Sequence, residues 1–177
     1  MNTDNIERRL NSFAKQVVKD SQDILQKEKG STSLGKSIRF QVSKEEGGFS
    51  TKFYMADYGE YLDKGVSGNE KKRSYKDYDN KTKTSPYNYT NKHPPTGILE
   101  KWIKRKGLKG RDKKSGRFIK NKSFAFAIAK SIQKKGIKSL SFFQRPLGLE
   151  FKKLEKDMLK MITLDIRSYL TEFYRPK

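Results

Sequence analysis

The sequence contains no cysteine and only one histidine. These absences exclude a disulfide framework and a thiolate or histidine metal cluster. No apolar run approaches the roughly 20 residues needed to span a bilayer, and the N-terminus lacks the apolar core of a signal peptide. We therefore expect no membrane, no metal and no cofactor, and a protein of the cytoplasm or of a particle assembled there.

Acidic residues are scarce relative to basic ones: 20 Asp and Glu stand against 41 Lys and Arg, a net charge of +21. A surplus of this size indicates an anionic partner, which could be nucleic acid, a membrane surface or an acidic protein. The alternative is a solvated surface that only keeps the protein soluble. Clustering of the charge favours a partner, because residues 101–122 hold 11 basic residues and one acidic residue, Asp112.

That basic stretch supplies the candidate contact residues for a protein partner or for DNA. They are Lys104, Arg105, Lys106, Lys109, Arg111, Lys113, Lys114 and Arg117. Part of the stretch, residues 108–122, is predicted to be a basic loop or a hairpin around Ser115-Gly116.

Periodicity predicts an α+β fold, with a small antiparallel sheet flanked by helices. Apolar residues at three- and four-residue spacing predict long N- and C-terminal helices and shorter helices between them. Strict alternation on both sides of the turn residues EEGG predicts an antiparallel hairpin. The predicted helices span 3–28, 57–64, 97–106, 123–135 and 148–173, and the predicted hairpin spans 37–55. In the second helix, Tyr58, Tyr61 and Leu62 are expected to face inward. In the third helix, 97–106, the inward residues are expected to be Leu99, Trp102 and Ile103.

Residues 66–96 contain almost no aliphatic side chain. A loop of this length is either functional or disordered. Its tyrosines Tyr75, Tyr78, Tyr87 and Tyr89 lie among lysines, as in stacking platforms for single-stranded nucleic acid. Tyrosine also suits protein interfaces, because it offers a large contact area with few rotatable bonds. Without the sequence pattern of a known nucleic-acid-binding fold, we favour a loop interface with protein.

Two motifs suggest chemistry that their context argues against. Residues 30–37, GSTSLGKS, fit the P-loop pattern, but a predicted helix leads in and a strand leads out, which is the reverse of a P-loop. Glu60 and Asp63 share a helical face and could hold Mg²⁺ for phosphodiester cleavage. A capping and solubilising pair is the simpler interpretation, because exposed carboxylates are common.

Three segments, in order, resemble the head–tail joining family of tailed bacteriophages, which includes neck, tail-completion and minor tail proteins. The first is Ser33–Ile38, SLGKSI, similar to the family's approach to its first strand. The second is Ala56–Gly65, ADYGEYLDKG, similar to a tyrosine-rich turn in which Val66 replaces the usual threonine. The third is Phe124–Phe143, a helix, a glycine turn at Gly136 and an aromatic docking strand before the last helix.

The length of the chain suits a single domain over 1–177, and the resemblance implies a core at 1–65 and 97–173 with an inserted basic loop at 66–96. It implies a non-enzymatic virion protein of the neck or tail, forming a six- or twelve-fold ring that joins the portal or an adaptor to the tail. Its partners would be copies of itself, the neighbouring portal, adaptor and tail proteins, and genomic DNA in the lumen through non-specific contact. The alternatives are a basic nucleic-acid-binding protein and, behind it, a metal-dependent nuclease.

Overall fold

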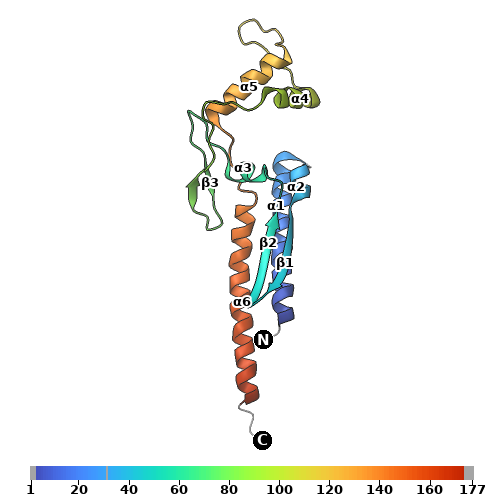
Figure 1. Cartoon of the computed structure of the whole chain (residues 1–177), viewed down its shortest axis with the longest axis vertical. Helices are drawn as coiled ribbons and strands as arrows, with labels where there is room; N and C mark the ends of the chain where they lie inside the picture. The colour runs from blue at the N-terminus through green and yellow to red at the C-terminus, as the bar shows by residue number, and fades with distance from the viewer. Residues whose placement is uncertain (1–2, 31, 174–177) are drawn as a thin grey trace. The chain divides into compact units, whose positions relative to one another are not determined.

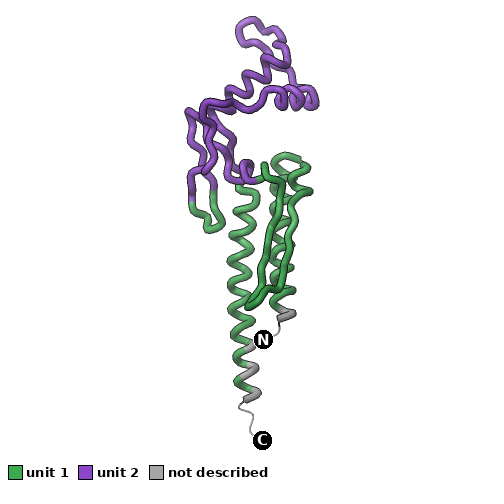
Figure 2. The backbone as a smooth tube through the Cα atoms, viewed as in Figure 1, with its two compact units in different colours: residues 1–59, 76–81, 141–177 green, residues 60–75, 82–140 purple. Residues whose placement is uncertain are grey.

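The computed structural model describes residues 3–30 and 32–173 (Figure 1). Within these ranges the chain is α+β, as predicted, with six helices and two two-stranded antiparallel sheets. The backbone forms two compact units (Figure 2). Unit 1 comprises the described residues within 1–59, 76–81 and 141–177, and unit 2 comprises 60–75 and 82–140. These boundaries differ from the division into a core and an inserted loop, and the single domain stays a prediction.

The core of unit 1 lies where α1 (Thr3–Lys29) packs against a hairpin and against α6 (Gln144–Phe173) (Figure 1). Apolar side chains of α1 recur at three- and four-residue spacing and so share one face. Phe13, Ala14 and Val17 are buried there with Leu154 of α6. The predicted apolar stripe of the N-terminal helix is therefore confirmed.

The hairpin of unit 1 also matches its prediction. Strand β1 (Arg39–Glu45) pairs antiparallel with β2 (Gly48–Tyr54). The turn between them contains Gly47 at φ +88°, a conformation that glycine adopts without steric cost. The Phe53 ring meets the rings of Phe13 and Phe143 edge-on, with centroids 6.2 and 5.3 Å apart. Alternation thus places the aromatic face of the hairpin on the core.

Helix α6 begins at Gln144, four residues before its predicted start. Pro146 is tolerated in the first turn, because the N–H groups there have no partner within the helix. The resemblance implies a docking strand at Phe142-Phe143, but the structure has a turn there. Phe142 is nevertheless fully buried, so it anchors the start of α6 through its side chain rather than through strand pairing.

In unit 2, α4 (Thr96–Lys106) packs against α5 (Asn121–Lys135). Ile103 is fully buried on the first helix, as are Ala125 and Ala129 on the second. Helix α5 ends at Gly136, whose φ is +69°. A Cβ at this position would lie 2.1 Å from the carbonyl oxygen of Val66. The glycine turn is therefore required by backbone geometry and by the close approach of another segment.

The predicted inner face of the short helix α3 (Gly59–Lys64) is wrong. Tyr58 and Tyr61 are 49% and 47% exposed, whereas Asp63 is buried. Tyr61 packs edge-on against the ring of Tyr87 at 4.5 Å instead of entering the core. A helix of six residues has too few turns for its apolar spacing to decide which face is buried.

Residues 66–96 are not a structureless loop. They contain the strands β3 (Ser74–Lys76) and β4 (Thr82–Thr84), and Val66 pairs with Ile137. The buried side chain of Gln133 donates to the carbonyl oxygens of Thr90 and Asn91 at 3.1 and 2.9 Å. Backbone and side-chain hydrogen bonds therefore order this segment in place of apolar burial. None of the helices in the described ranges is long and apolar enough to cross a membrane.

Candidate functional site

The positive charge is concentrated in unit 2. Its 75 residues include 21 basic and 5 acidic ones, a net charge of +16, while unit 1 has 20 basic and 15 acidic residues. The surplus found in the sequence therefore belongs mainly to one unit. An anionic partner is expected to bind there.

The densest part of this charge is carried by a hairpin between α4 and α5, residues 108–120, which we call the basic hairpin. Helix α4 ends at Gly107 with φ +63°. The two arms of the hairpin pair through an isolated antiparallel β-bridge between Arg111 and Phe118. Ile119 N–H donates to the carbonyl oxygen of Gly110 at 3.0 Å. The predicted hairpin around Ser115-Gly116 is thus confirmed.

Asp112 fixes the tip of the basic hairpin. Its Oδ1 accepts hydrogen bonds from Lys114 N–H at 3.0 Å, Ser115 N–H at 2.8 Å and the Ser115 hydroxyl at 2.9 Å. The hydrogen bonds from Ser115 hold the pKa of the Asp112 carboxyl below its usual value. Hydrogen-bond donors favour the ionised form of a carboxyl group. The single acidic residue of the segment therefore stabilises the turn at the tip of the basic hairpin. Lys113 and Lys114 are exposed at this tip.

The basic hairpin presents an aromatic ring beside two cations. Phe118 is 60% exposed. The guanidinium of Arg111 lies 4.5 Å from its ring centroid, and the Lys109 ammonium lies 5.7 Å away. These are cation–π distances. At the base of the hairpin, a Cβ on the buried Gly110 would lie 2.7 Å from the ring of Phe124, so glycine lets the hairpin sit close against α5.

All eight basic residues proposed from the sequence lie in unit 2, on the last turn of α4 and along the basic hairpin, and all eight are exposed. Within this set, Lys104 forms an ion pair with Glu100 at 3.1 Å. The fold therefore keeps these cations on one continuous and accessible segment.

The four tyrosines proposed as a loop interface do not lie together. Tyr78 is in unit 1, at the turn between β3 and β4, while the other three belong to unit 2. Tyr87 donates a hydrogen bond to the carboxylate of Glu60. This bond raises the pKa of Tyr87 to about 12 and lowers the pKa of Glu60. Burial raises the pKa of the Tyr89 phenol. Tyr75 is half-buried. Tyr75, Tyr87 and Tyr89 therefore place part of their surface against unit 2 itself.

The same contact weakens the nuclease alternative. Glu60 is exposed and also lies 3.4 Å from Lys64, whereas Asp63 is buried. The two carboxylates therefore do not open onto one shared site. Among the side chains that the structure describes, no group of three His, Cys, Asp or Glu residues is placed to hold a metal ion.

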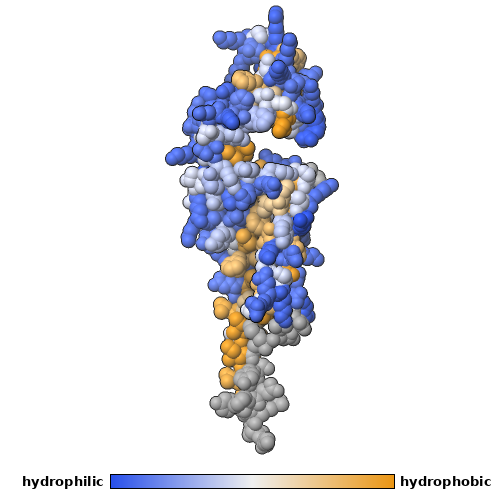
Figure 3. Space-filling view, in the orientation of Figure 1, coloured by the Kyte–Doolittle hydropathy of each residue, from blue (hydrophilic) through white to orange (hydrophobic). Residues whose placement is uncertain are grey.

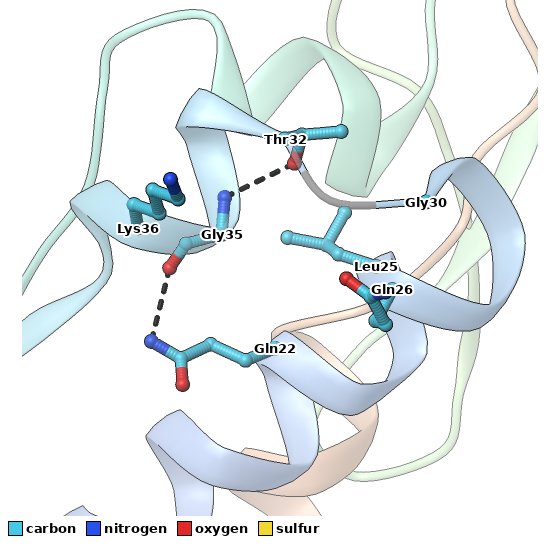
Figure 4. Close-up of a pocket in the computed structure, with 7 residues that line it drawn as sticks. All are labelled: Gln22, Leu25, Gln26, Gly30, Thr32, Gly35 and Lys36. Carbon is cyan, nitrogen blue, oxygen red and sulfur yellow. Dashed lines mark hydrogen bonds between the residues drawn. The ribbon is translucent and has the colours of Figure 1, made fainter.

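The P-loop-like segment lines a pocket of about 190 Å³ (Figure 4). This segment follows the helix α1, and its last residues form the short helix α2 (Ser33–Ser37), which precedes β1. A P-loop instead follows a strand, so the order of elements here is not that of a P-loop. The Gly35 amide donates to Thr32 Oγ1 at 3.2 Å, and the Gly35 carbonyl accepts from Gln22 at 3.0 Å. The Gly35 amide thus already has a partner within the chain. Ser31 of the motif lies outside the described residues.

Sequence reasoning missed one feature of unit 2, a groove between α4 and α5. It has a volume of about 590 Å³ and is mainly apolar, with Trp102 on its wall. The sequence placed Trp102 on an inner face, but the side chain is 37% exposed. The sequence feature that could have indicated the groove is Ile98, an apolar residue on the same helix beside the predicted inner residue Leu99.

No protein-family profile, curated protein or solved structure matches this chain.

Proposed function

We propose that this chain is a structural virion protein of the tailed-phage neck, a ring-forming connector or tail-completion subunit that joins the portal or an adaptor to the tail. The three segments that resemble the family occupy compatible places in the fold. Ser33–Ile38 leads into β1, Gly65 closes α3, and Gly136 follows α5 ahead of the buried Phe142 and α6. This arrangement supports the proposal.

The observation that carries the proposal is an uncovered apolar stripe on α6. Leu159, Ile162, Ile166 and Leu170 are spaced by three, four and four residues and so share one face. Their exposed fractions are 62%, 37%, 54% and 49%. In the space-filling view, apolar surface continues along α6 (Figure 3). Large contiguous apolar surfaces mark association sites, and copies of this chain in a ring would cover the stripe.

The test is the assembly state of the full chain, alone and with the proteins encoded beside it in its phage genome. We expect rings by native mass spectrometry and negative-stain microscopy, formed by the chain alone or on a partner. Ile162→Glu with Ile166→Glu should reduce ring formation at least tenfold, because two charges would be buried at the contact. A chain that stays monomeric beside its neighbours would contradict the proposal.

The matched control is Leu164→Glu with Thr171→Glu, which adds the same charge to exposed positions on another face of the same helix. This variant should assemble like the parent. Equal loss in both double variants would mean that charge on α6, rather than the apolar stripe, governs assembly.

A second function, nucleic-acid binding by the isolated chain, is favoured by the exposed Phe118 ring, which lies near Lys109 and Arg111. An aromatic ring flanked by cations suits stacking on single-stranded nucleic acid. If this were the main function, the monomer should bind a labelled single-stranded oligonucleotide at moderate salt. Phe118→Ala should then weaken binding roughly tenfold, given about 1–3 kcal/mol per stacked base.

A further inference from the structure

The groove between α4 and α5 is a preformed apolar surface of unit 2. Five apolar side chains line it: Ile98, Leu99 and Trp102 from α4, and Ile128 and Ile132 from α5. The spacing of four residues between Ile98 and Trp102, and between Ile128 and Ile132, aligns each wall with its helix axis. Ile98 is 67% exposed. Apolar groups left in water at a concave site favour an occupant that covers them.

The edge of the groove is cationic. Lys101 and Arg105 also line it, and neither forms an ion pair with an acidic side chain of the described residues. By contrast, Lys104 on the same helix pairs with Glu100 at 3.1 Å. Together α4 and α5 contain eight basic residues and one acidic residue. The occupant must therefore bring both apolar side chains and negative charge.

We propose that this groove binds an acidic amphipathic helix of a partner protein. Apolar residues at i, i+3, i+4 and i+7 of that helix would lie on the groove floor, as in other helix-in-groove complexes. Its Asp or Glu side chains would pair with Lys101 and Arg105. Helix α4 has 11 residues, so the wall is about 16 Å long and matches about three turns of a bound helix.

Charge argues against the other occupants. A second copy would offer α1 or α6, but each has six basic and five acidic residues, so neither brings the required negative surplus. Nucleic acid would satisfy the cations, but its phosphates would leave the aliphatic floor uncovered. An acidic amphipathic helix satisfies both features of the groove.

The inference goes beyond the proposed neck function and does not depend on it, because it rests on the groove alone. The proposed function is tested by the assembly state of the chain and by variants of the apolar stripe on α6, which belongs to unit 1. The groove is tested with a peptide on the isolated full chain. Failure of one proposal is therefore distinguishable from failure of the other.

Trp102 makes the groove directly observable, because it is the only tryptophan of the chain. The probe is a capped synthetic helix of about 15 residues, with leucine at i, i+3, i+4 and i+7 and glutamate on the remaining face. We expect a saturable blue shift of Trp102 emission as the peptide excludes water, with the same midpoint in the anisotropy of the labelled peptide. A leucine–lysine peptide and a serine–glutamate peptide should each bind at least tenfold more weakly.

Two sets of variants locate the contact. Lys101→Glu with Arg105→Glu should weaken binding of the leucine–glutamate peptide at least tenfold, and Ile98→Ser should weaken it several-fold. All three side chains are exposed, and far-UV circular dichroism checks that each variant is folded. The matched control is Lys113→Glu with Lys114→Glu, which makes the same charge change at the tip of the basic hairpin and should leave the affinity within twofold.

Four results would overturn the proposal. The first is the absence of any saturable change in Trp102 emission. The second is equal binding of the serine–glutamate peptide, which would show attraction by bare charge. The third is equal loss of affinity in the groove and hairpin variants, which would show that net charge rather than the groove selects the peptide. Stronger competition by an oligonucleotide than by the acidic peptide would likewise assign the surface to nucleic acid.

Discussion

Gly148, in the second turn of α6, shows how a single residue positions a whole element. A Cβ there would lie 1.8 Å from the carbonyl oxygen of Tyr78, in the turn between β3 and β4. The same turn donates from Tyr78 N–H to the side chain of Gln144 at 3.2 Å. The close approach of backbone to backbone at Gly148 therefore lets this turn dock on the start of α6.

Gly148→Ala should lower the free energy of unfolding by roughly 1–3 kcal/mol. The added Cβ would clash with the main chain of Tyr78, and the clash is relieved only if that main chain moves away from α6. Urea unfolding followed by far-UV circular dichroism measures the change. Gly97→Ala is the matched control: Gly97 lies in the first turn of α4, and a Cβ there meets nothing within 4 Å. That variant should be neutral or up to about 1 kcal/mol more stable. A neutral Gly148→Ala variant would show that the turn is not held against α6.

At the scale of elements, the basic hairpin depends on Asp112. Asp112→Ala removes an acceptor of three hydrogen bonds at the tip. Trypsin needs locally flexible backbone, so cleavage after Lys113 and Lys114 should become several-fold faster than in the parent. Mass spectrometry of the early fragments measures the rate at each site.

Asp112→Asn is the control for this element, because its side-chain oxygen can still accept from Ser115. Its cleavage rate should lie close to that of the parent. If alanine and asparagine variants were cut equally fast, the charge of Asp112 rather than its acceptor geometry would hold the tip. If neither differed from the parent, the tip would be fixed by other contacts.

Elements with long, regular signals could be predicted from the sequence. The stripe of α1 persists over many turns, and alternation around EEGG defines β1 and β2, so both predictions are confirmed. The order within residues 66–96 could not be predicted, because its partners are distant in sequence: Gln133 reaches Thr90 and Asn91. No local pattern records such a bond.

The candidate site was predictable in charge but not in shape. Lysine and arginine density marks residues 101–122 directly. Whether an apolar residue on α4 is buried depends on how closely α5 packs, and the exposure of Trp102 follows from that packing. The tyrosines were misgrouped because sequence proximity placed Tyr78 with Tyr75, whereas the chain sends them to different units.

At the scale of the whole molecule, the asymmetry of charge is the property that a neck protein would use. Unit 2 has a net charge of +16 within 75 residues. Like charges at this density repel one another and favour an anionic neighbour. In a neck ring, that neighbour is either an acidic face of an adjoining protein or the genome in the lumen. Both contacts weaken with salt, so salt dependence does not distinguish them.

Charge reversal on the basic hairpin does distinguish them. The test variant carries Lys109→Glu, Arg111→Glu, Lys113→Glu and Lys114→Glu. If the hairpin binds a neighbouring protein, as we expect, heads and tails should accumulate unjoined in electron micrographs, because four attractive charges become repulsive. If it faces the genome, joined particles should form and release DNA abnormally. A conduit must let DNA slide, and a wall of phosphate-binding lysines would hinder that movement, which favours the protein contact.

The control for this experiment reverses four exposed lysines elsewhere in the same unit, which are Lys71, Lys72, Lys92 and Lys138. It makes the same change in net charge without touching the basic hairpin, so it should leave joining and infectivity within about twofold of the parent if position matters. Equal loss in both variants would indicate that total charge governs assembly. Normal joining and infectivity after charge reversal on the hairpin would show that it contacts neither a neighbouring protein nor the genome. Its charge would then serve only as a solvated surface.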